Sequence, residues 1–302
     1  MKHSPNKTGV VEVYAPKSPL APVVMDSPHS GTDYPADFGY SVGMEHLRYG
    51  VDFEIDQLFG SAPTFGAWLV AARFPRSYID PNRSPADLDT RMIDGEWPEK
   101  TEPSVKTANG HGLIWKVAGR SSRPIYNRLL SVSEVRNRID NYWRPYRQVL
   151  ADRLEKMTAD FGGYWHINCH SMPSLWPQGF EGAGTAVPYD AIIGTRDGMT
   201  CSPEVAHHAR DLLAGLGLNV AVDVGFKGVD LVIDHGDPAA NRHSLQIEIN
   251  RGLYMDEANF QRSAGYEPLR DALTQFIDSF TAEARAAFRI PARRSNGLFH
   301  TF

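Results

Sequence analysis

The chain has 302 residues, of which 42% are hydrophobic and 22% charged, a composition typical of a globular protein with a sizeable core. Its formal net charge of -5 gives no basic footprint for nucleic acid, and no apolar run reaches the roughly 18 residues of a transmembrane helix. Two cysteines, Cys169 and Cys201, are too few for a disulfide framework, so we expect a cytoplasmic protein.

The N-terminal segment, residues 1–20, has the composition of an irregular arm. Four prolines fall within the first 22 residues, and the segment lacks the uninterrupted apolar core of a secretory signal. The rest of the chain contains no internal repeat, no low-complexity tract and no composition shift typical of a domain boundary. We therefore expect residues 1–302 to form a single domain.

Short apolar runs alternate along the chain with longer helical patterns, which is typical of an α/β sheet protein. Strands are predicted, in chain order, at residues 22–25, 68–72, 77–79, 164–168, 190–193, 220–224 and 244–249. Apolar residues recur at three-to-four spacing in residues 45–59, 133–161, 203–216 and 266–288, which predicts amphipathic helices there. In the second helix, Pro145 should introduce a kink and Gly162 should end it.

The stretch 81–126 differs from the rest of the chain. It is rich in proline, glycine, aspartate and arginine, and its hydrophobic periodicity is weak. A long irregular excursion inside a compact domain is usually functional. We predict that this stretch is an insertion that covers a substrate.

Residues that could carry chemistry stand at the ends of three predicted strands. His29 follows the strand at 22–25 in "VVMDSPHSG", and His170 follows the strand at 164–168 in "HINCHSM". Glu248 lies within the strand at 244–249, where alternation puts it on the face opposite the neighbouring isoleucines. The carboxyl ends of strands in open α/β sheets are where ligands usually bind.

Two histidines and one carboxylate, with an open position, form the ligand set of a catalytic zinc ion. The acids that follow His29 most closely in a suitable segment are Asp52, Glu54 and Asp56, and spacing alone does not choose among them. Glu248 would then be free to act as a general base.

Each of these residues also has a purely structural interpretation. A histidine at a strand end is often a hydrogen-bonded structural residue. Asp52 could form an ion pair with Arg48 on a helix face. Glu248 could pair with an arginine such as Arg251 or Arg83.

Arginines gather in the segment "RFPRSYIDPNR". The guanidinium fork binds carboxylates through two parallel hydrogen bonds, so Arg83, with Arg76 and Asn82, could hold an anionic substrate. Alternatively these are surface arginines, and Asp80 is a turn residue. Lys227, in the glycine-flanked loop "GFKGVD", could bind a second carboxylate or could be an ordinary exposed lysine.

The blocks "SPHSG", "YGVDFEIDQLF", "RSYIDPNR", "CHS" and "HSLQIEINRGLYMDE" together resemble the N-formylglutamate amidohydrolase (deformylase) family. They run from about Pro28 to Glu257 in the order expected for that family. The resemblance implies a metal-dependent hydrolase with a fold similar to the zinc carboxypeptidases, of the phosphorylase/hydrolase-like type. We therefore expect a mixed, mostly parallel central sheet with helices on both faces.

The resemblance also assigns roles to residues. It places one divalent metal ion, expected to be zinc, on His29, Asp52 and His170, with Glu54 as the alternative to Asp52. It places the catalytic acid of the family's Q-x-E block on Glu248.

The family's D-x-N-R block falls on Asp80, Asn82 and Arg83, and its upstream arginine falls on Arg76. The resemblance implies substrate binding by Arg83, with Arg76 and Asn82. The sequence departs from the family at two positions. Asn168 stands where the family usually has aspartate, and Val229 replaces a loop glycine. These changes bear on which N-acyl amino acid the enzyme accepts more than on the reaction that it catalyses.

The expected reaction is hydrolysis of N-formyl-L-glutamate to formate and L-glutamate, which the resemblance connects with histidine degradation. The alternatives are a carboxypeptidase-like or other N-acyl amino acid amidohydrolase, and a non-catalytic binding protein on the same fold. The expected partner is a small anionic substrate, with no nucleic acid or membrane, and the sequence does not indicate the oligomeric state. The basic segment 289–302 is expected to be a packed or frayed end.

Overall fold

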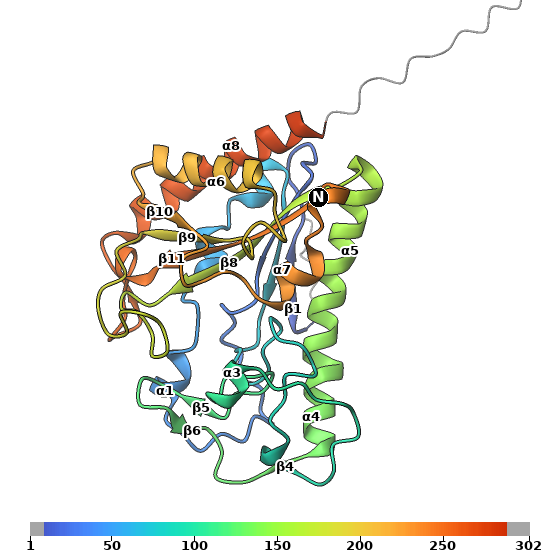
Figure 1. Cartoon of the computed structure of the whole chain (residues 1–302), viewed down its shortest axis with the longest axis vertical. Coiled ribbons are helices and arrows are strands. Elements are labelled where there is room, and N and C mark those ends of the chain that lie inside the picture. Colours follow the sequence, from blue (N-terminus) through green and yellow to red (C-terminus); the bar gives the residue numbers. More distant parts are fainter. Residues whose placement is uncertain (1–8, 289–302) are drawn as a thin grey trace, which may run out of the picture.

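The computed structural model of the protein describes residues 9–288. A seven-stranded sheet runs through the molecule (Figure 1). Its order is β1-β3-β2-β8-β11-β9-β10. The strands are β1 (Val11–Tyr14), β2 (Val23–Ser27), β3 (Trp68–Ala72), β8 (Tyr164–Met172), β9 (Ala191–Gly194), β10 (Val220–Val222) and β11 (Arg242–Asn250). The β1–β3 and β9–β11 pairings are antiparallel and the other pairings within the sheet are parallel. The expected mixed, mostly parallel sheet is confirmed.

Helices cover both faces of this sheet. One core cluster contains apolar residues of α2 (Ile55–Leu58), α6 (Pro203–Gly215) and α8 (Tyr266–Ala287). The cluster on the other face contains residues of α4 (Val132–Arg138) and α5 (Arg144–Phe161). Figure 1 shows α6 and α8 side by side along one edge of the molecule, with α5 upright beside the sheet.

The remaining elements are short. They are the helices α1 (Met44–Arg48), α3 (Val105–Ala108) and α7 (Asp230–His235), the strands β4 (Ile93–Asp94), β5 (Val117–Ala118), β6 (Arg123–Pro124), β7 (Leu130–Ser131), β12 (Met255–Asp256) and β13 (Gln261–Arg262), and the single-turn 3-10 helices η1 (Ala62–Phe65), η2 (Thr90–Met92), η4 (Pro238–Ala240) and η5 (Arg251–Leu253). Among residues 9–288, no helix is both long and apolar enough to cross a membrane.

The long helices follow the predicted apolar stripes. The helix predicted at 266–288 is α8, and its stripe from Leu269 to Ala284 is buried against the sheet. The helix predicted at 133–161 is continuous, but a π-helical turn, η3 (Ile139–Trp143), separates α4 from α5 just before Pro145. Proline has no N–H to donate to the preceding turn, and the wider π turn accommodates that loss. Gly162 ends α5 in the left-handed conformation, with φ of 81°.

Three sequence-based predictions are wrong. The strand predicted at 77–79 is a turn that starts at Pro75, and Tyr78 is buried there as a core residue without strand pairing. The helix predicted at 45–59 is interrupted between α1 and α2, because the N–H of Asp52 bonds instead to the carbonyl of His29. Residues 11–14, expected to be part of an irregular arm, form the edge strand β1 with alternating burial.

The two strands at the centre of the sheet are longer than predicted. β8 and β11 pair in parallel over nine residues, from Arg242 opposite Tyr164 to Asn250 opposite Met172. His170 therefore lies within β8, and not beyond its end as expected. The register places Glu248 opposite His170, which brings the polar residues of both strands to one site.

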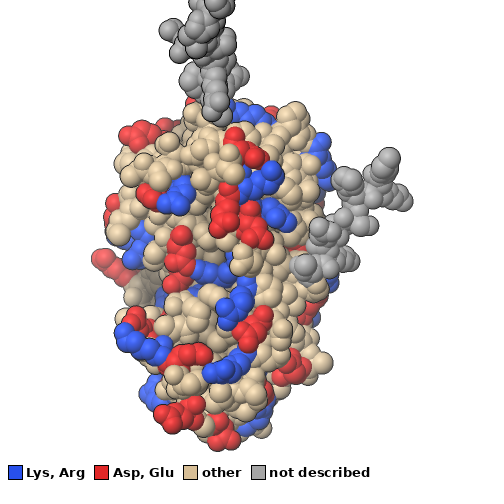
Figure 2. Space-filling view, turned by 90° about the vertical axis from the view of Figure 1, so that its right-hand side faces the viewer, with Lys and Arg blue, Asp and Glu red and all other residues tan. Residues whose placement is uncertain are grey.

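The stretch 81–126 is largely irregular, apart from η2, β4, α3, β5 and β6. Figure 1 shows it, in teal to green, on the side of the molecule opposite α6 and α8. Acidic and basic side chains are intermingled on the face that Figure 2 shows. Residues 1–8 of the expected arm and the basic segment 289–302 lie outside the described residues.

Candidate active site

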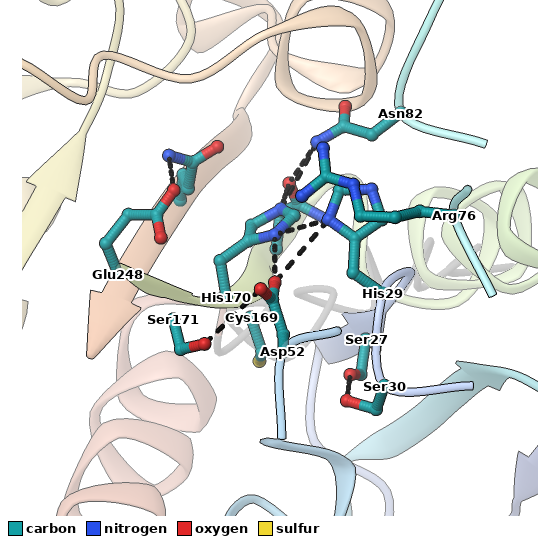
Figure 3. A network of polar contacts seen from close by, with 12 residues as sticks. Ser27, His29, Ser30, Asp52, Arg76, Asn82, Cys169, His170, Ser171 and Glu248 are labelled. Atoms are coloured by element: carbon teal, nitrogen blue, oxygen red, sulfur yellow. Dashed lines mark hydrogen bonds and ion pairs between the residues drawn. The ribbon is translucent and has the colours of Figure 1, made fainter. Parts of the chain in front are cut away.

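Three buried side chains from distant parts of the chain converge on one point (Figure 3). His29 follows β2, Asp52 lies between α1 and α2, and His170 lies in β8. The Nδ1 atoms of the two histidines are 3.1 Å apart. Asp52 Oδ2 lies 3.0 Å from Nδ1 of His170 and 3.5 Å from Nδ1 of His29. The three side chains are at most 3% exposed.

This arrangement fits a divalent metal ion. Two imidazole nitrogens that face each other across a shared carboxylate oxygen are a natural donor set for such an ion, and zinc accepts both ligand types. The alternative ligand Glu54 is turned away, because Arg262 Nε donates to its Oε2 at 2.6 Å. Within residues 9–288, the group of potential metal ligands consists of His29, Asp52 and His170. The geometry therefore favours Asp52 over Glu54.

His29 is oriented from behind by a carboxylate. Its Nε2 lies 2.7 Å from Asp80 Oδ1, and the guanidinium of Arg76 donates to Asp80 Oδ2 at 2.8 and 3.1 Å. Burial alone would raise the pKa of Asp80, but the charges of Arg76 and His29 outweigh it and hold that pKa well below its usual range. The ionised Asp80 can fix the N–H of His29 on Nε2, which leaves Nδ1 free as a ligand. Arg76 thus supports the histidine through Asp80.

The second oxygen of Asp52 is held by Arg251. Arg251 Nη2 donates to Asp52 Oδ1 at 3.0 Å, and Arg251 Nε donates to Ser171 Oγ at 2.9 Å. Burial opposes ionisation of Asp52, but in the metal-free protein its interactions with His170 and His29 outweigh burial and keep the pKa of Asp52 well below its usual range. From the sequence, Arg251 was considered a partner of Glu248, so its contact with Asp52 is a finding of the structure.

Glu248 lies beside the three ligands without a cationic partner. Its Oε1 accepts a hydrogen bond of 2.8 Å from Gln246 Nε2, and no ion pair joins it to another residue of the described chain. Burial, and then the negative charge of Asp52, raise the pKa of Glu248 to about 8. The alternative in which Glu248 forms a salt bridge with Arg251 or Arg83 is therefore wrong. A carboxylate with a raised pKa beside a metal site is typical of a general base.

The predicted substrate residues fall into different environments. Arg83 is only 8% exposed, and its Nε has no hydrogen-bond partner among residues 9–288. Asn82 is occupied, because its Oδ1 accepts the N–H of Leu231 at 2.9 Å and its Nδ2 donates to Asn168 Oδ1 at 3.2 Å. Arg83 is thus a buried cation with donors free for an anion.

Lys227 has a partner of its own. Its Nζ donates to both carboxylate oxygens of Asp197, at 2.6 and 2.9 Å, and both side chains are exposed. A substrate carboxylate would have to compete with Asp197 for this ammonium group.

Comparisons with known proteins identify the family of this chain. The sequence profile of the N-formylglutamate amidohydrolase family matches residues 21–255. The chain belongs to this family. The N-formylglutamate deformylase of Pseudomonas aeruginosa is 28% identical over 283 residues, which cover 92% of this chain and 99% of that protein. The resemblance drawn from the sequence blocks is confirmed.

Two solved structures place this N-formylglutamate amidohydrolase family member among known folds. The crystal structure of an N-formylglutamate amidohydrolase from Ralstonia eutropha JMP134 superposes with a TM-score of 0.86 at 40% identity, covering 92% of this chain and 99% of that one. The gene product Atu2144 from Agrobacterium tumefaciens has a TM-score of 0.61 at 17% identity, covering 92% and 95% of the two chains, so it shares the fold.

One cation of this amidohydrolase was missed by the sequence analysis. Lys106, on α3 in the stretch 81–126, has its Nζ 5.3 Å from the ring centroid of Phe180. Desolvation and the neighbouring charges of Arg83 and Arg76 lower the pKa of Lys106, while Glu248 acts in the opposite sense. Lys106 therefore belongs to the electrostatic environment of the site. No motif surrounds it in the sequence that could have identified it.

The raised pKa of Glu248 should make the metal-free protein less stable as pH rises. Unfolded, this carboxyl ionises near 4.5, and folded near 8, so the folded state holds the extra proton between these values. We therefore expect the free energy of unfolding of the metal-free protein to fall between about pH 5 and 8. Glu248→Gln should remove this part of the dependence. Urea unfolding at pH 5.5 and 8.0 measures it, and equal pH slopes in both proteins would contradict the assignment.

Proposed function

We propose that this protein is a zinc-dependent amidohydrolase that cleaves N-formyl-L-glutamate to formate and L-glutamate. The observation that carries the proposal is the convergence of His29, Asp52 and His170 beside a buried Glu248 that forms no ion pair within residues 9–288. Family membership and the names of the similar proteins from Pseudomonas aeruginosa and Ralstonia eutropha support the choice of substrate.

The metal would be held by Nδ1 of His29, Nδ1 of His170 and Oδ2 of Asp52. A divalent ion at this position supplies a Lewis acid that polarises the formyl oxygen and can lower the pKa of a water molecule from about 15.7 to about 7. The residues behind the ligands fix their orientation: Asp80 holds His29, and Arg251 holds Asp52. Zinc is the proposed ion because histidine and carboxylate ligands with an open position are typical of catalytic zinc.

Glu248 carries the proton in the proposed reaction. Its carboxylate takes a proton from the attacking water, whose oxygen forms a bond to the formyl carbon. The carbon–nitrogen bond then breaks, and Glu248 delivers the proton to the departing amine of glutamate. In the metal-free site the pKa of Glu248 is raised to about 8. The positive charge of a bound divalent ion would lower this pKa toward the working pH, where a group can both accept and return a proton.

Arg83 is proposed to bind one carboxylate of the substrate, since its side chain is buried and its Nε has no hydrogen-bond partner within residues 9–288. We expect Arg83→Ala to raise KM for N-formyl-L-glutamate about 10- to 100-fold, equivalent to the ~1.5–3 kcal/mol of a hydrogen bond to a charged group. The effect on kcat should be smaller unless binding also positions the formyl group. Steady-state kinetics of formate release measure both, with the exposed Arg123→Ala as control. An unchanged KM would remove Arg83 from the substrate site.

The second substrate carboxylate needs another cation, and Lys106 and Lys227 are the two candidates. We propose Lys106, because Lys227 is already paired with Asp197 and Lys106 lies in the electrostatic environment of Glu248 and Arg83. We expect Lys106→Met to raise KM for N-formyl-L-glutamate about tenfold or more and to leave KM for N-formyl-L-glutamine nearly unchanged.

Lys227→Met is the matched control for Lys106→Met, and kinetics with both substrates check the assignment. If Lys227→Met, and not Lys106→Met, discriminates between the charged and the neutral side chain, the original assignment of Lys227 stands. This role of Lys106 would also give the stretch 81–126 its proposed function of covering the substrate.

The direct test is formate release from N-formyl-L-glutamate by zinc-loaded protein and by chelator-treated protein. Release that is lost on chelation and restored by zinc is the expected result. No release from folded, zinc-loaded protein would overturn the proposed substrate. Assays of other N-acyl amino acids and of peptides with a free carboxyl terminus would then distinguish another amidohydrolase or a carboxypeptidase from a binding protein.

The proposal extends to the whole chain. We propose that residues 1–302 form one domain and that the enzyme acts in the cytoplasm in histidine degradation. The two core clusters on opposite faces of one sheet support the single domain, and the resemblance to the deformylase family supports the pathway.

A further inference from the structure

A second group of polar side chains lies buried behind His170. It consists of Asp26 on β2, Tyr146 on α5, and His166 and Asn168 on β8, and all four are fully buried. The parallel pairing of β2 and β8 places Asp26 directly opposite Asn168. None of these four residues belongs to the proposed metal ligands or substrate-binding residues. A buried carboxylate such as Asp26 is costly, so its presence here requires another explanation.

Asp26 is the centre of this group. It accepts hydrogen bonds from the hydroxyl of Tyr146 at 2.6 Å, from Nε2 of His166 at 2.9 Å and from Nδ2 of Asn168 at 2.8 Å. Burial raises the pKa of Asp26, but the hydrogen bonds from these three donors outweigh it, so that the pKa is lowered. Asp26 is thus a buried carboxylate that remains charged. A single side chain, that of Asn168, separates it from His170.

The orientation of Asn168 follows from this charge. A carboxylate only accepts hydrogen bonds, so the Nδ2 side of the Asn168 amide must face Asp26. Its Oδ1 then faces His170, 2.5 Å from Nε2. Asn82 Nδ2 donates to the same oxygen at 3.2 Å, and the N–H of Leu231 in turn fixes the orientation of Asn82. The amide of Asn168 therefore has one possible orientation.

We propose that Asp26 and Asn168 are positioning residues that act on His170 in series. The Asn168 oxygen holds the proton of His170 on Nε2, so that the Nδ1 lone pair points toward His29 and Asp52. The Asn168 amide lies between Asp26 and His170. The buried charge of Asp26 orients this amide, and the amide in turn favours the His170 tautomer with its proton on Nε2. His29 receives the same support directly from Asp80, so the two histidines are oriented by different chemistry. Groups that orient metal ligands in this way typically change metal affinity 10- to 100-fold when removed.

The inference rests on the metal site of the proposed function, and zinc affinity tests it without an activity assay. Asn168→Leu keeps the approximate shape and removes the acceptor. We expect its zinc dissociation constant, measured by competition with a chromogenic chelator, to rise about 10- to 100-fold. Ser244→Ala is the matched control, because the buried Ser244 adjoins this group through a 2.7 Å contact between its Oγ and His166 Nδ1 and forms no hydrogen bond with Asn168 within residues 9–288.

A double variant separates positioning from general disruption of the core. In Asp26→Asn/Asn168→Asp the amide and the carboxylate exchange places. The new carboxylate at position 168 can still accept a hydrogen bond from the Nε2–H of His170. His166 can adjust by changing tautomer, since the Ser244 hydroxyl can donate or accept. We expect zinc affinity within a few-fold of wild type in this variant. Asn168→Asp alone, with two facing carboxylates, should mainly lower the melting temperature of the metal-free protein.

The outcomes distinguish the two levels of the proposal. Wild-type protein that binds no zinc would overturn the metal site itself. Wild-type protein that binds zinc, with an affinity that Asn168→Leu changes no more than Ser244→Ala does, would overturn the positioning role alone. A double variant that folds with a wild-type melting temperature but binds zinc as weakly as Asn168→Leu would overturn the proposed action of Asp26 and Asn168 in series.

Discussion

Glu248→Gln is expected to reduce kcat for formate release by about 10²- to 10⁴-fold, the usual contribution of a positioned general base. Glutamine has nearly the same shape as glutamate but cannot take a proton from water. Because Glu248 is not among the three converging ligands, the zinc content of the purified variant should equal that of the wild type. Stopped-time formate assays and metal analysis on the same samples measure both quantities.

The control for this variant is Glu155→Gln, which removes a carboxyl from the exposed face of α5. It should leave kcat and zinc content unchanged. Wild-type turnover by zinc-loaded Glu248→Gln would overturn the proposed mechanism. Within residues 9–288, Asp52 and Asp80 already interact with His170, His29 and Arg251, so neither could replace Glu248 as the general base. Loss of both turnover and zinc would instead point to a structural role for Glu248.

Asp52→Asn is expected to weaken zinc binding by more than the 10- to 100-fold that loss of a supporting residue costs. The substitution removes the anionic ligand and leaves Arg251 as a buried cation without its partner, which also destabilises the metal-free protein. Turnover should fall with zinc occupancy. Zinc affinity by chelator competition and the melting temperature of the metal-free protein separate the two effects.

Glu54→Gln is the matched comparison, because Glu54 was the alternative ligand from the sequence. Its side chain pairs with Arg262 near the surface, and this pair contributes little to stability. Zinc affinity and turnover should therefore stay near wild type. The reverse result, with zinc lost in Glu54→Gln and kept in Asp52→Asn, would mean that the segment between α1 and α2 adopts a different arrangement when metal is bound.

Hydrophobic periodicity predicted the elements that have strong periodicity. The strand at 68–72 and the helices at 203–216 and 266–288 agree with β3, α6 and α8 to within a residue or two. Periodicity failed where single tertiary contacts decide local structure. The N–H of Asp52 bonds to His29 and interrupts an otherwise helical pattern. Tyr78 is buried by packing in a turn, although its segment has the composition of a strand.

The site was predictable to the extent that its residues lie in recognisable blocks. His29, His170 and Glu248 were identified because each adds a polar group to an apolar strand, and the structure brings all three together. The choice between Asp52 and Glu54 could not be made from spacing, because both lie in a segment whose backbone changes direction at Glu54, with φ of 50°. Lys106 was missed because its irregular segment gives no pattern.

The sequence by itself determined the fold class, the family and the chemical character of the site, since strand and helix periods and short motifs are local properties. Tertiary structure decided which charges meet. Pairing of β2 with β8 puts Asp26 against Asn168, and pairing of β8 with β11 puts Glu248 opposite His170. Arg251 reaches Asp52 across 199 residues of sequence. Such contacts depend on register and burial, which only the assembled sheet fixes, and they set the charge state and orientation of each group in the site.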